Sequence, residues 1–165
     1  MLYLIDGYNL LFKLFHNEKS IQTQRTLTIQ FLKEKASLLK LNCHLIFDAH
    51  HQEEIVAHKT DADRLKVIYT PKSQTADEYI LEKVFLSKTP SQITVITSDN
   101  SLAFQAKNML SQTKSIDDFI DFLSEKELHL EKKETSKEES IDTKINIQRL
   151  LKIFEDKLNN DEDFL

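Results

Sequence analysis

Uninterrupted apolar runs alternate with longer amphipathic segments along the first 125 residues. The runs at residues 2–5, 43–47, 65–69 and 93–97 are short and largely apolar, which is typical of strands buried on both faces of a parallel sheet. The intervening segments place apolar residues at helical spacing, as in the helix expected over 20–41, whose stripe is Leu27, Phe31, Leu38 and Leu39. Strands joined through helices predict right-handed crossovers and a mostly parallel, three-layer α/β sheet.

Local signals mark where several helices begin. Ser20 can cap the first long helix, Thr75 and Glu78 have the spacing of a capping box, and Ser98 or Asp99 can cap the next helix. Residues 113–115 fit a short last strand or a loop, and Ser115 begins a further helix. The residues expected to be buried by the three later helices are Ile80, Val84 and Phe85; Leu102, Ala103, Ala106, Met109 and Leu110; and Ile116, Phe119, Ile120 and Leu123.

The chain divides into a domain at 1–130, a polar linker at 131–140 and a C-terminal segment at 141–165. The linker contains no apolar residue and is typical of a solvated segment. Helical periodicity returns in residues 141–158, and an extra helix there needs a surface to pack on. The surface could be its own domain, a second copy of the chain or a partner protein, and the first two are favoured. The acidic residues after 158 are expected to fray. A homodimer through this helix is therefore one expectation.

Composition and charge limit the class of protein. The 165 residues are 40% hydrophobic and 30% charged, which is ordinary for one globular domain. The single cysteine, Cys43, lies in an apolar run and is expected in the core. No stretch approaches the roughly 20 apolar residues of a membrane span, and Met1 leads directly into the first run without a basic signal segment, so the cytoplasm is the expected location.

The net charge of −5 is uneven and supplies no basic footprint. Residues 1–130 carry 15 Lys/Arg and 17 Asp/Glu, and residues 131–165 carry 7 and 10. This balance counts against tight, sequence-independent binding of RNA. It does not exclude an enzyme, because a metal site uses several acids.

Carboxylates follow the predicted strands. Asp6, Asp48 and Asp99 come after apolar runs, and Asp77 and Glu78 open the helix that follows the third run. Parallel strands bring their carboxyl ends to one edge, where like charges repel unless a cation neutralises them. Magnesium prefers oxygen ligands and uses few carboxylates together with substrate phosphate. The alternative is that the aspartates only cap helices. Gly7, the single glycine, allows a sharp turn after Asp6.

In combination, five motifs resemble a known family. They are Leu4-Ile5-Asp6-Gly7-Tyr8-Asn9, Phe47-Asp48-Ala49-His50, Val67-Ile68-Tyr69-Thr70, Thr75-Ala76-Asp77-Glu78 and Thr97-Ser98-Asp99-Asn100. In this order they look like the YacP-like branch of the NYN domain, within the PIN-like nuclease superfamily, over about residues 1–125. The resemblance implies a Rossmann-like (PIN-like) fold and a metal-dependent endoribonuclease using Mg or Mn. It makes Asp6, Asp77 and Asp99 metal-site acids, Asn9 an orienting residue, and Asp48 and Glu78 further members.

The chain departs from the family in the loop after the helix that follows the last acid. The family has a Gly-rich, Arg-containing loop there, whereas residues 109–115 contain neither, and Lys114 would act only as a point charge. Lys72 could face an RNA backbone, and Asn100, in the last motif, is a further residue expected to bind RNA. Tyr8 could stack on a base or pack in the core. His50 and His51 could reach a metal or phosphate or be solvated. The tail after Glu131 lies outside the resemblance.

The expected activity is hydrolysis of RNA phosphodiester bonds, with single-stranded RNA or mRNA as substrate. A catalytically silent module that binds RNA or the ribosome on the same fold is the alternative, and the altered loop and the acidic balance favour it. A phosphatase acting on small molecules is a third possibility. A dehalogenase-type phosphatase would carry a second aspartate two residues after the first, and that position is Tyr8.

Overall fold

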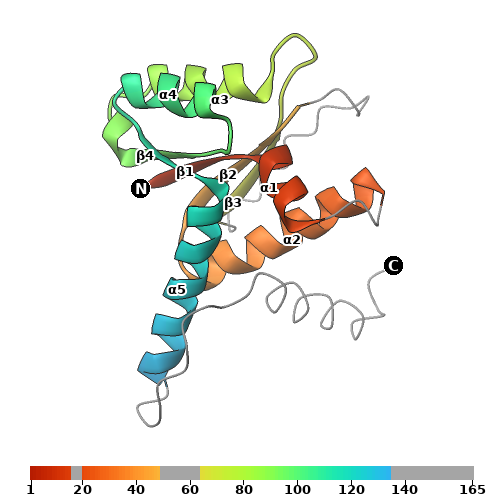
Figure 1. The fold of residues 1–165 in the computed structure, drawn as a ribbon, viewed down its shortest axis with the longest axis vertical. Coiled ribbons are helices and arrows are strands. Elements are labelled where there is room, and N and C mark those ends of the chain that lie inside the picture. Colours follow the sequence, from red (N-terminus) through yellow and green to blue (C-terminus); the bar gives the residue numbers. More distant parts are fainter. Residues whose placement is uncertain (16–19, 49–63, 135–165) are drawn as a thin grey trace. The chain divides into compact units, whose positions relative to one another are not determined.

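Five parallel strands form the sheet of the computed structural model, which describes residues 1–15, 20–48 and 64–134. The strands are β1 (Leu2–Asp6), β2 (Asn42–Phe47), β3 (Leu65–Tyr69), β4 (Ile93–Ile96) and β5 (Gln112–Lys114). Their order is β3-β2-β1-β4-β5, with every pairing parallel (Figure 1). The predicted α/β sheet is therefore confirmed, and residues 112–114 form a strand rather than a loop. Two compact units, Met1–Phe119 and Ile120–Leu165, divide the chain.

The helices alternate with the strands as the sequence predicts. They are α1 (Gly7–Leu14), α2 (Ile21–Leu38), α3 (Ala76–Phe85), the 3-10 turn η2 (Pro90–Gln92), α4 (Asn100–Asn108) and α5 (Ile116–Glu134). The pair α1 and α2 covers one face of the sheet and the pair α3 and α4 covers the other (Figure 1). This arrangement makes three layers within the first unit.

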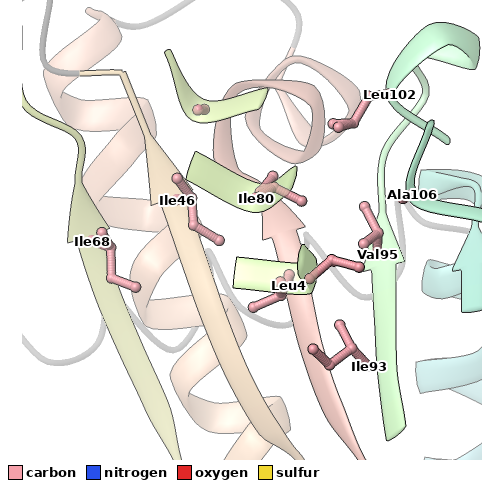
Figure 2. Packing of buried hydrophobic residues seen from close by; sticks show 10 residues of the cluster. Leu4, Ile46, Ile68, Ile80, Ile93, Val95, Leu102 and Ala106 are labelled. Carbon is pink, nitrogen blue, oxygen red and sulfur yellow. The ribbon is translucent and has the colours of Figure 1, made fainter. Parts of the chain in front are cut away.

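The core beneath α3 and α4 is purely aliphatic. Figure 2 shows strand residues meeting Ile80 of α3 and Leu102 and Ala106 of α4. Leu4 and Val95 in this cluster are fully buried, as is Ile80. Burial of this kind stabilises a fold by about 25 cal/mol per Å² of apolar surface. It fixes β1, β2 and β4 side by side, and with them the residues at their carboxyl ends.

The predicted helix caps are present. Ser20 Oγ accepts a hydrogen bond from the Thr23 backbone N–H (3.2 Å). Thr75 and Glu78 form the capping box, in which the Thr75 hydroxyl accepts from the Glu78 N–H and the Glu78 carboxylate accepts from the Thr75 N–H. Each such cap satisfies an orphan backbone donor and contributes about 1 kcal/mol.

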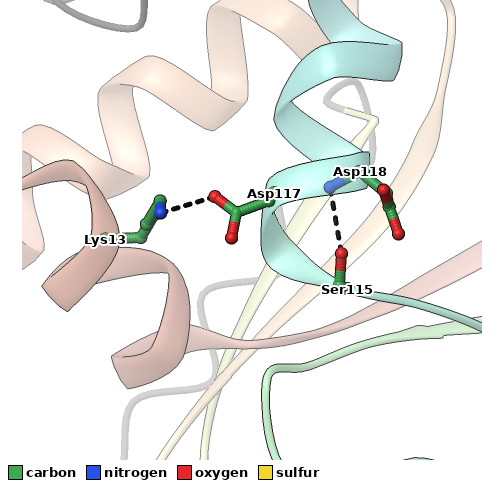
Figure 3. Close-up of polar contacts among 4 residues, drawn as sticks. All are labelled: Lys13, Ser115, Asp117 and Asp118. Carbon is green, nitrogen blue, oxygen red and sulfur yellow. Dashed lines mark hydrogen bonds and ion pairs between the residues drawn. The ribbon is translucent and has the colours of Figure 1, made fainter.

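The first turn of α5 is fixed in the same way. Ser115 Oγ accepts from the Asp118 N–H at 3.0 Å (Figure 3). An ion pair between Lys13 of α1 and Asp117, with Nζ and Oδ1 2.5 Å apart, joins the beginning of α5 to α1 (Figure 3). Its side chains are 40% and 61% exposed, so it adds little to stability.

Three side chains expected in the core are exposed instead. Phe85 is 74% exposed, Leu110 is 75% exposed and Leu38 is 51% exposed. All three lie where a helix stops. Leu38 and Phe85 are the last residues of α2 and α3. Leu110 follows α4 with a φ of 65°, in the left-handed region, so it leaves the helical stripe.

The linker was predicted to begin at residue 131, but α5 continues through Glu134. The helix expected at 141–158, the rest of the linker, and His50 and His51 lie outside the described residues. Within the described part of the chain, no helix has the length and apolar character needed to cross a membrane.

Candidate functional site

Asp6 ends the central strand and caps α1. Its side chain is almost completely buried, at 6% exposure. Oδ1 accepts from the Asn9 backbone N–H (3.2 Å) and Oδ2 accepts from the Asn9 side-chain amide (2.7 Å). Burial raises the pKa of Asp6 to about 6, the Asn9 N–H lowers it, and the charges of Asp77 and Asp48 raise it further. A buried carboxylate at this position is therefore poorly solvated and repelled by its neighbours.

Asn9 connects the end of β1 to the segment after β4. While its amide nitrogen donates to Asp6, its carbonyl Oδ1 accepts from the Ser98 backbone N–H at 2.8 Å. The amide is held at both ends, which leaves Asn9 one orientation only. The group that Asn9 orients in this structure is the Asp6 carboxylate.

Thr97 was not predicted as a site residue, yet it lies between Asp6 and Asp99. Its hydroxyl is 3.5 Å from both Asp6 Oδ2 and Asn9 Oδ1, and it accepts from the Asp99 backbone N–H at 3.0 Å. Thr97 is buried, with 3% exposure. A polar residue directly after an apolar strand is the sequence signal that could have identified it.

Asp99 caps α4 through one oxygen. Oδ1 accepts from the backbone N–H groups of Ser101 (2.6 Å) and Leu102 (3.0 Å). The side chain is exposed at the carboxyl end of β4. Among the described residues no hydrogen bond reaches Oδ2 of Asp99, so capping leaves this oxygen available for another ligand.

The remaining acids gather around the beginning of α3. Asp48, just after β2, uses Oδ1 to accept from the Ala76 N–H (2.5 Å) and so ties α3 to the sheet. Glu78 is exposed and engaged in the capping box. Asp77 is half-buried, and no hydrogen bond from the described residues ends on its carboxylate. Burial raises the pKa of Asp77, and the charges of Asp99, Asp48 and Glu78 raise it further.

One edge of the sheet, which we call the carboxylate edge, carries Asp6, Asp48, Asp77 and Asp99. Three strand ends and the first turn of α3 supply its four members. No group of three or more His, Cys, Asp or Glu in residues 1–15, 20–48 and 64–134 is close enough to form a metal cage. The caps and the tether of the helix-cap alternative are present, and convergence of the acids on one metal stays a prediction.

Gly7 allows close packing at the point where the chain passes from β1 directly into α1. It is the first residue of α1, and its φ is not positive. A Cβ built on Gly7 would lie 2.6 Å from the Ile46 carbonyl oxygen and 2.6 Å from the Phe47 ring. Only glycine lets α1 begin this close to the end of β2.

The four residues predicted to touch RNA are spread along the same edge. Lys72 follows β3 and is exposed, Lys114 ends β5 and is half-buried, and Asn100 is the exposed first residue of α4. Because β3 and β5 are the outer strands, the two lysines are at opposite ends of the edge. The Tyr8 ring packs edge-on against Phe47, with centroids 5.2 Å apart.

Comparison with known proteins agrees with this architecture. The sequence model of the YacP-like NYN domain matches residues 3–161, nearly the whole chain. The chain belongs to the YacP-like NYN domain family. The match extends to residue 161, so the tail after Glu131 lies inside the NYN domain match, contrary to the expected boundary. No curated protein matches the chain.

Two solved structures resemble this NYN domain. One is the crystal structure of a single-substitution mutant of Rae1 (YacP) from Bacillus subtilis, with a TM-score of 0.62 and 23% identity, covering 97% of this chain and 99% of that one. The other is Rae1 (YacP) from Bacillus subtilis without that mutation, with a TM-score of 0.60 and 24% identity, covering 98% and 86%. These likenesses establish that the chain shares the α/β fold of those structures.

Proposed function

We propose that this NYN domain is a metal-dependent endoribonuclease whose active site is the carboxylate edge. The observation that carries the proposal is that burial raises the pKa of both Asp6 and Asp77 at one end of the sheet, and that the charges of neighbouring acids, Asp48 among them, raise both further. Repulsion of this kind destabilises the fold. It persists at little cost only if a cation neutralises it during function.

The donor atoms suit magnesium or manganese. All are carboxylate oxygens, which these hard cations prefer, and magnesium keeps several waters instead of requiring a complete protein cage. Asp77 has both oxygens available, and Oδ2 of Asp48 and of Asp99 accept no hydrogen bond from the described residues. These three side chains, with Asp6, would hold the ion partly through the waters that magnesium keeps, since they do not form a complete cage. Glu78 lies beside Asp77 in the capping box.

A bound ion of this type supplies an activated water and neutralises charge that develops on a phosphate. The protein's own residues supply orientation. Asn9 holds Asp6 by two hydrogen bonds and is itself fixed by the Ser98 N–H. Thr97 holds the backbone of Asp99. Placement of reacting groups by such rigid contacts is a major source of rate enhancement.

A catalytically silent module that binds RNA or the ribosome is the second candidate. One observation favours it. Asp6, Asp48, Glu78 and Asp99 each accept a backbone N–H, so each already has a structural role without an ion. In that case the edge would be a set of helix caps and tethers on a nuclease-like fold.

A cleavage assay with Asp77→Asn separates the candidates. Asp77 is the best position because no cap or tether depends on its carboxylate, so the variant is expected to fold. We expect wild-type protein to cut a short unstructured RNA in magnesium or manganese and not in chelator. Loss of one metal ligand is expected to slow cleavage by at least a hundredfold, about 2.7 kcal/mol of transition-state stabilisation.

Asp118→Asn is the matched control, because it makes the same change on an exposed side chain at the beginning of α5. It should cut RNA at the wild-type rate. Cleavage by Asp77→Asn at the wild-type rate would refute the site assignment. Wild-type protein that binds RNA but does not cut it with either metal would support the silent module.

A further inference from the structure

The first helix carries an exposed aromatic side chain. Three phenylalanines in the described part of the chain are more than half exposed: Phe12 on α1, Phe85 at the end of α3 and Phe104 on α4. Among the described residues, Phe12 is the one of these three that contacts another aromatic ring. Its ring is stacked on that of Tyr8, with centroids 5.9 Å apart and an interplanar angle of 24°. Phe12 is nevertheless 54% exposed, so much of its ring remains open to a ligand.

Three further rings, which we call the aromatic row, support the ring of Phe12. The row begins with Tyr8, which meets the fully buried Phe47 edge-on with centroids 5.2 Å apart, and it ends with Tyr69, which stacks on Phe47 at 5.7 Å. Aromatic pairs at such separations are favourable beyond the area that they bury. A ring held in this way is already ordered, so a ligand that stacks on Phe12 pays little for fixing it.

Phe12 and the aromatic row lie close to the carboxylate edge. Asp6 is the N-cap of α1, so the backbone of Phe12 is only about 9 Å farther along the helix axis. Side chains on a helix lean toward its N-terminus, and the contact of Phe12 with Tyr8, one turn earlier, shows that its ring does so. Within the row, Phe47 is followed directly by Asp48. Chain connectivity and ring contacts thus join Phe12 to two acids of the edge.

We propose that Phe12, supported by Tyr8, is a stacking platform for one unpaired base of the RNA, close to the phosphodiester that is cut. The inference rests on the proposed function and deepens it, because it names single-stranded RNA as the substrate class. Every base has a π-face that can stack on an aromatic ring, and such contacts hold single strands without regard to sequence. Bases inside a duplex are stacked on one another and do not offer that face.

A stacking platform would also suit the charge of this chain. The net charge is −5, and residues 109–115 lack the arginine that the resemblance led us to expect. Contacts between basic residues and phosphates release counterions, so the affinity that they supply falls as salt rises. A base stacked on Phe12 neutralises no phosphate, and its contribution to affinity remains at high salt. An acidic chain can therefore hold RNA near the site through an aromatic surface.

Fluorescence gives the first test, because the chain contains no tryptophan. Phe12→Trp places an indole on the platform, and the control Phe85→Trp places one at the exposed end of α3. Both are made in an Asp77→Asn background, which is expected to bind RNA without cutting it. A short unstructured RNA should quench the emission of Phe12→Trp and leave that of Phe85→Trp unchanged. If bound RNA leaves the emission of Phe12→Trp unchanged, the platform is overturned.

RNA binding gives the second test, in the same Asp77→Asn background. Each RNA of a short series lacks one base, at successive positions. We expect one position at which the missing base weakens binding about tenfold, equivalent to about 1.4 kcal/mol. Phe12→Ala should bind unmodified RNA about tenfold more weakly at low and at high salt, and it should show no such position. Phe12→Trp should keep the positional effect, and Phe85→Ala should match its parent.

The outcomes separate this inference from the proposed function. If Phe12→Leu, which keeps an apolar side chain without a π-face, retains full affinity and the positional effect, stacking is overturned. If Phe12→Ala breaks up a dimer in light scattering and binds RNA normally, Phe12 is a contact between copies of the chain and the platform is overturned. If RNA is cut and Phe12→Ala has the wild-type KM, the platform is overturned and the endoribonuclease remains. If the wild-type chain neither binds nor cuts RNA, both are overturned.

Discussion

Replacing Asp6 by asparagine should stabilise the metal-free protein at neutral pH. The pKa of Asp6 is raised from its ordinary value of 3.8 to about 6, mainly by burial. The native state therefore holds the Asp6 proton more tightly than the unfolded chain does. Its stability falls as pH rises between about 4 and about 6, and above pH 6 the loss is complete.

The size of the change in stability follows from the pKa shift of Asp6. One pKa unit corresponds to 1.36 kcal/mol, so a shift of about two units costs the wild-type fold about 3 kcal/mol at pH 7.5. Asp6→Asn avoids this cost but loses the hydrogen bond between Oδ2 and the Asn9 amide, worth about 1 kcal/mol. The capping bond from the Asn9 N–H survives, because asparagine also caps helices well. The net gain is about 2 kcal/mol.

Urea unfolding in chelator at pH 4.5 and pH 7.5 measures the effect. The contribution of the lost hydrogen bond does not depend on pH. The change with pH in the stability difference between Asp6→Asn and wild type therefore reports the ionisation of the Asp6 carboxylate alone. The free energy of unfolding of Asp6→Asn relative to wild type should increase by about 2 kcal/mol between the two pH values. The exposed control Asp118→Asn, measured in parallel, gives the contribution of removing one surface charge.

A pH-independent difference in the free energy of unfolding between Asp6→Asn and wild type would contradict this prediction. It would mean that Asp6 ionises as easily in the fold as in the unfolded chain, and that water or a counter-charge reaches it. The electrostatic argument for a cation at the carboxylate edge would then lose its main support. A destabilised Asp6→Asn at pH 7.5 would point to Asp6 as a cap and nothing more.

Three smaller predictions test the packing with urea unfolding. Gly7→Ala should destabilise by about 1–3 kcal/mol, because its Cβ would meet the Ile46 carbonyl oxygen at 2.6 Å; an unchanged stability would show that α1 can shift. Leu110→Asn should stabilise by about 0.5–1 kcal/mol, since φ is 65° and the side chain is exposed; no gain would mean that leucine is not strained there. Ser115→Ala should cost about 1 kcal/mol by removing the acceptor for the Asp118 N–H; a negligible effect would mean that this cap does not matter.

The sequence predicted the strands and helix caps, because these depend on residues that are close together in the chain. A strand covered on both faces must be apolar along its length, so the runs around Leu4, Ile46 and Val95 identified the central strands. Caps such as Thr75 and Asp99 were found because they act on amides within three residues. Parallel strands then implied a shared edge for the acids.

The burial and contacts of side chains were predicted less well where they depend on the positions and ends of neighbouring helices and strands. Phe85 lies about 100° around the helix from Val84, and α3 ends there, so no layer covers it. Arg25 is buried although arginine is usually exposed, and no local pattern in the sequence predicts this. The contacts of Thr97 with residues 91 positions earlier could not be derived from a local pattern.

The central position of β1 has a consequence for how the protein is made. β1 is synthesised before the other strands, but its two neighbours in the sheet are β2 and the much later β4. Until residues 97–99 have been synthesised, Asp6 lacks its link to Asp99 and the carboxylate edge does not exist. The nascent chain is therefore without an assembled site until β4 and the residues that follow it have been made. Until then, the edge of β1 that pairs with β4 is unpaired and exposed to aggregation.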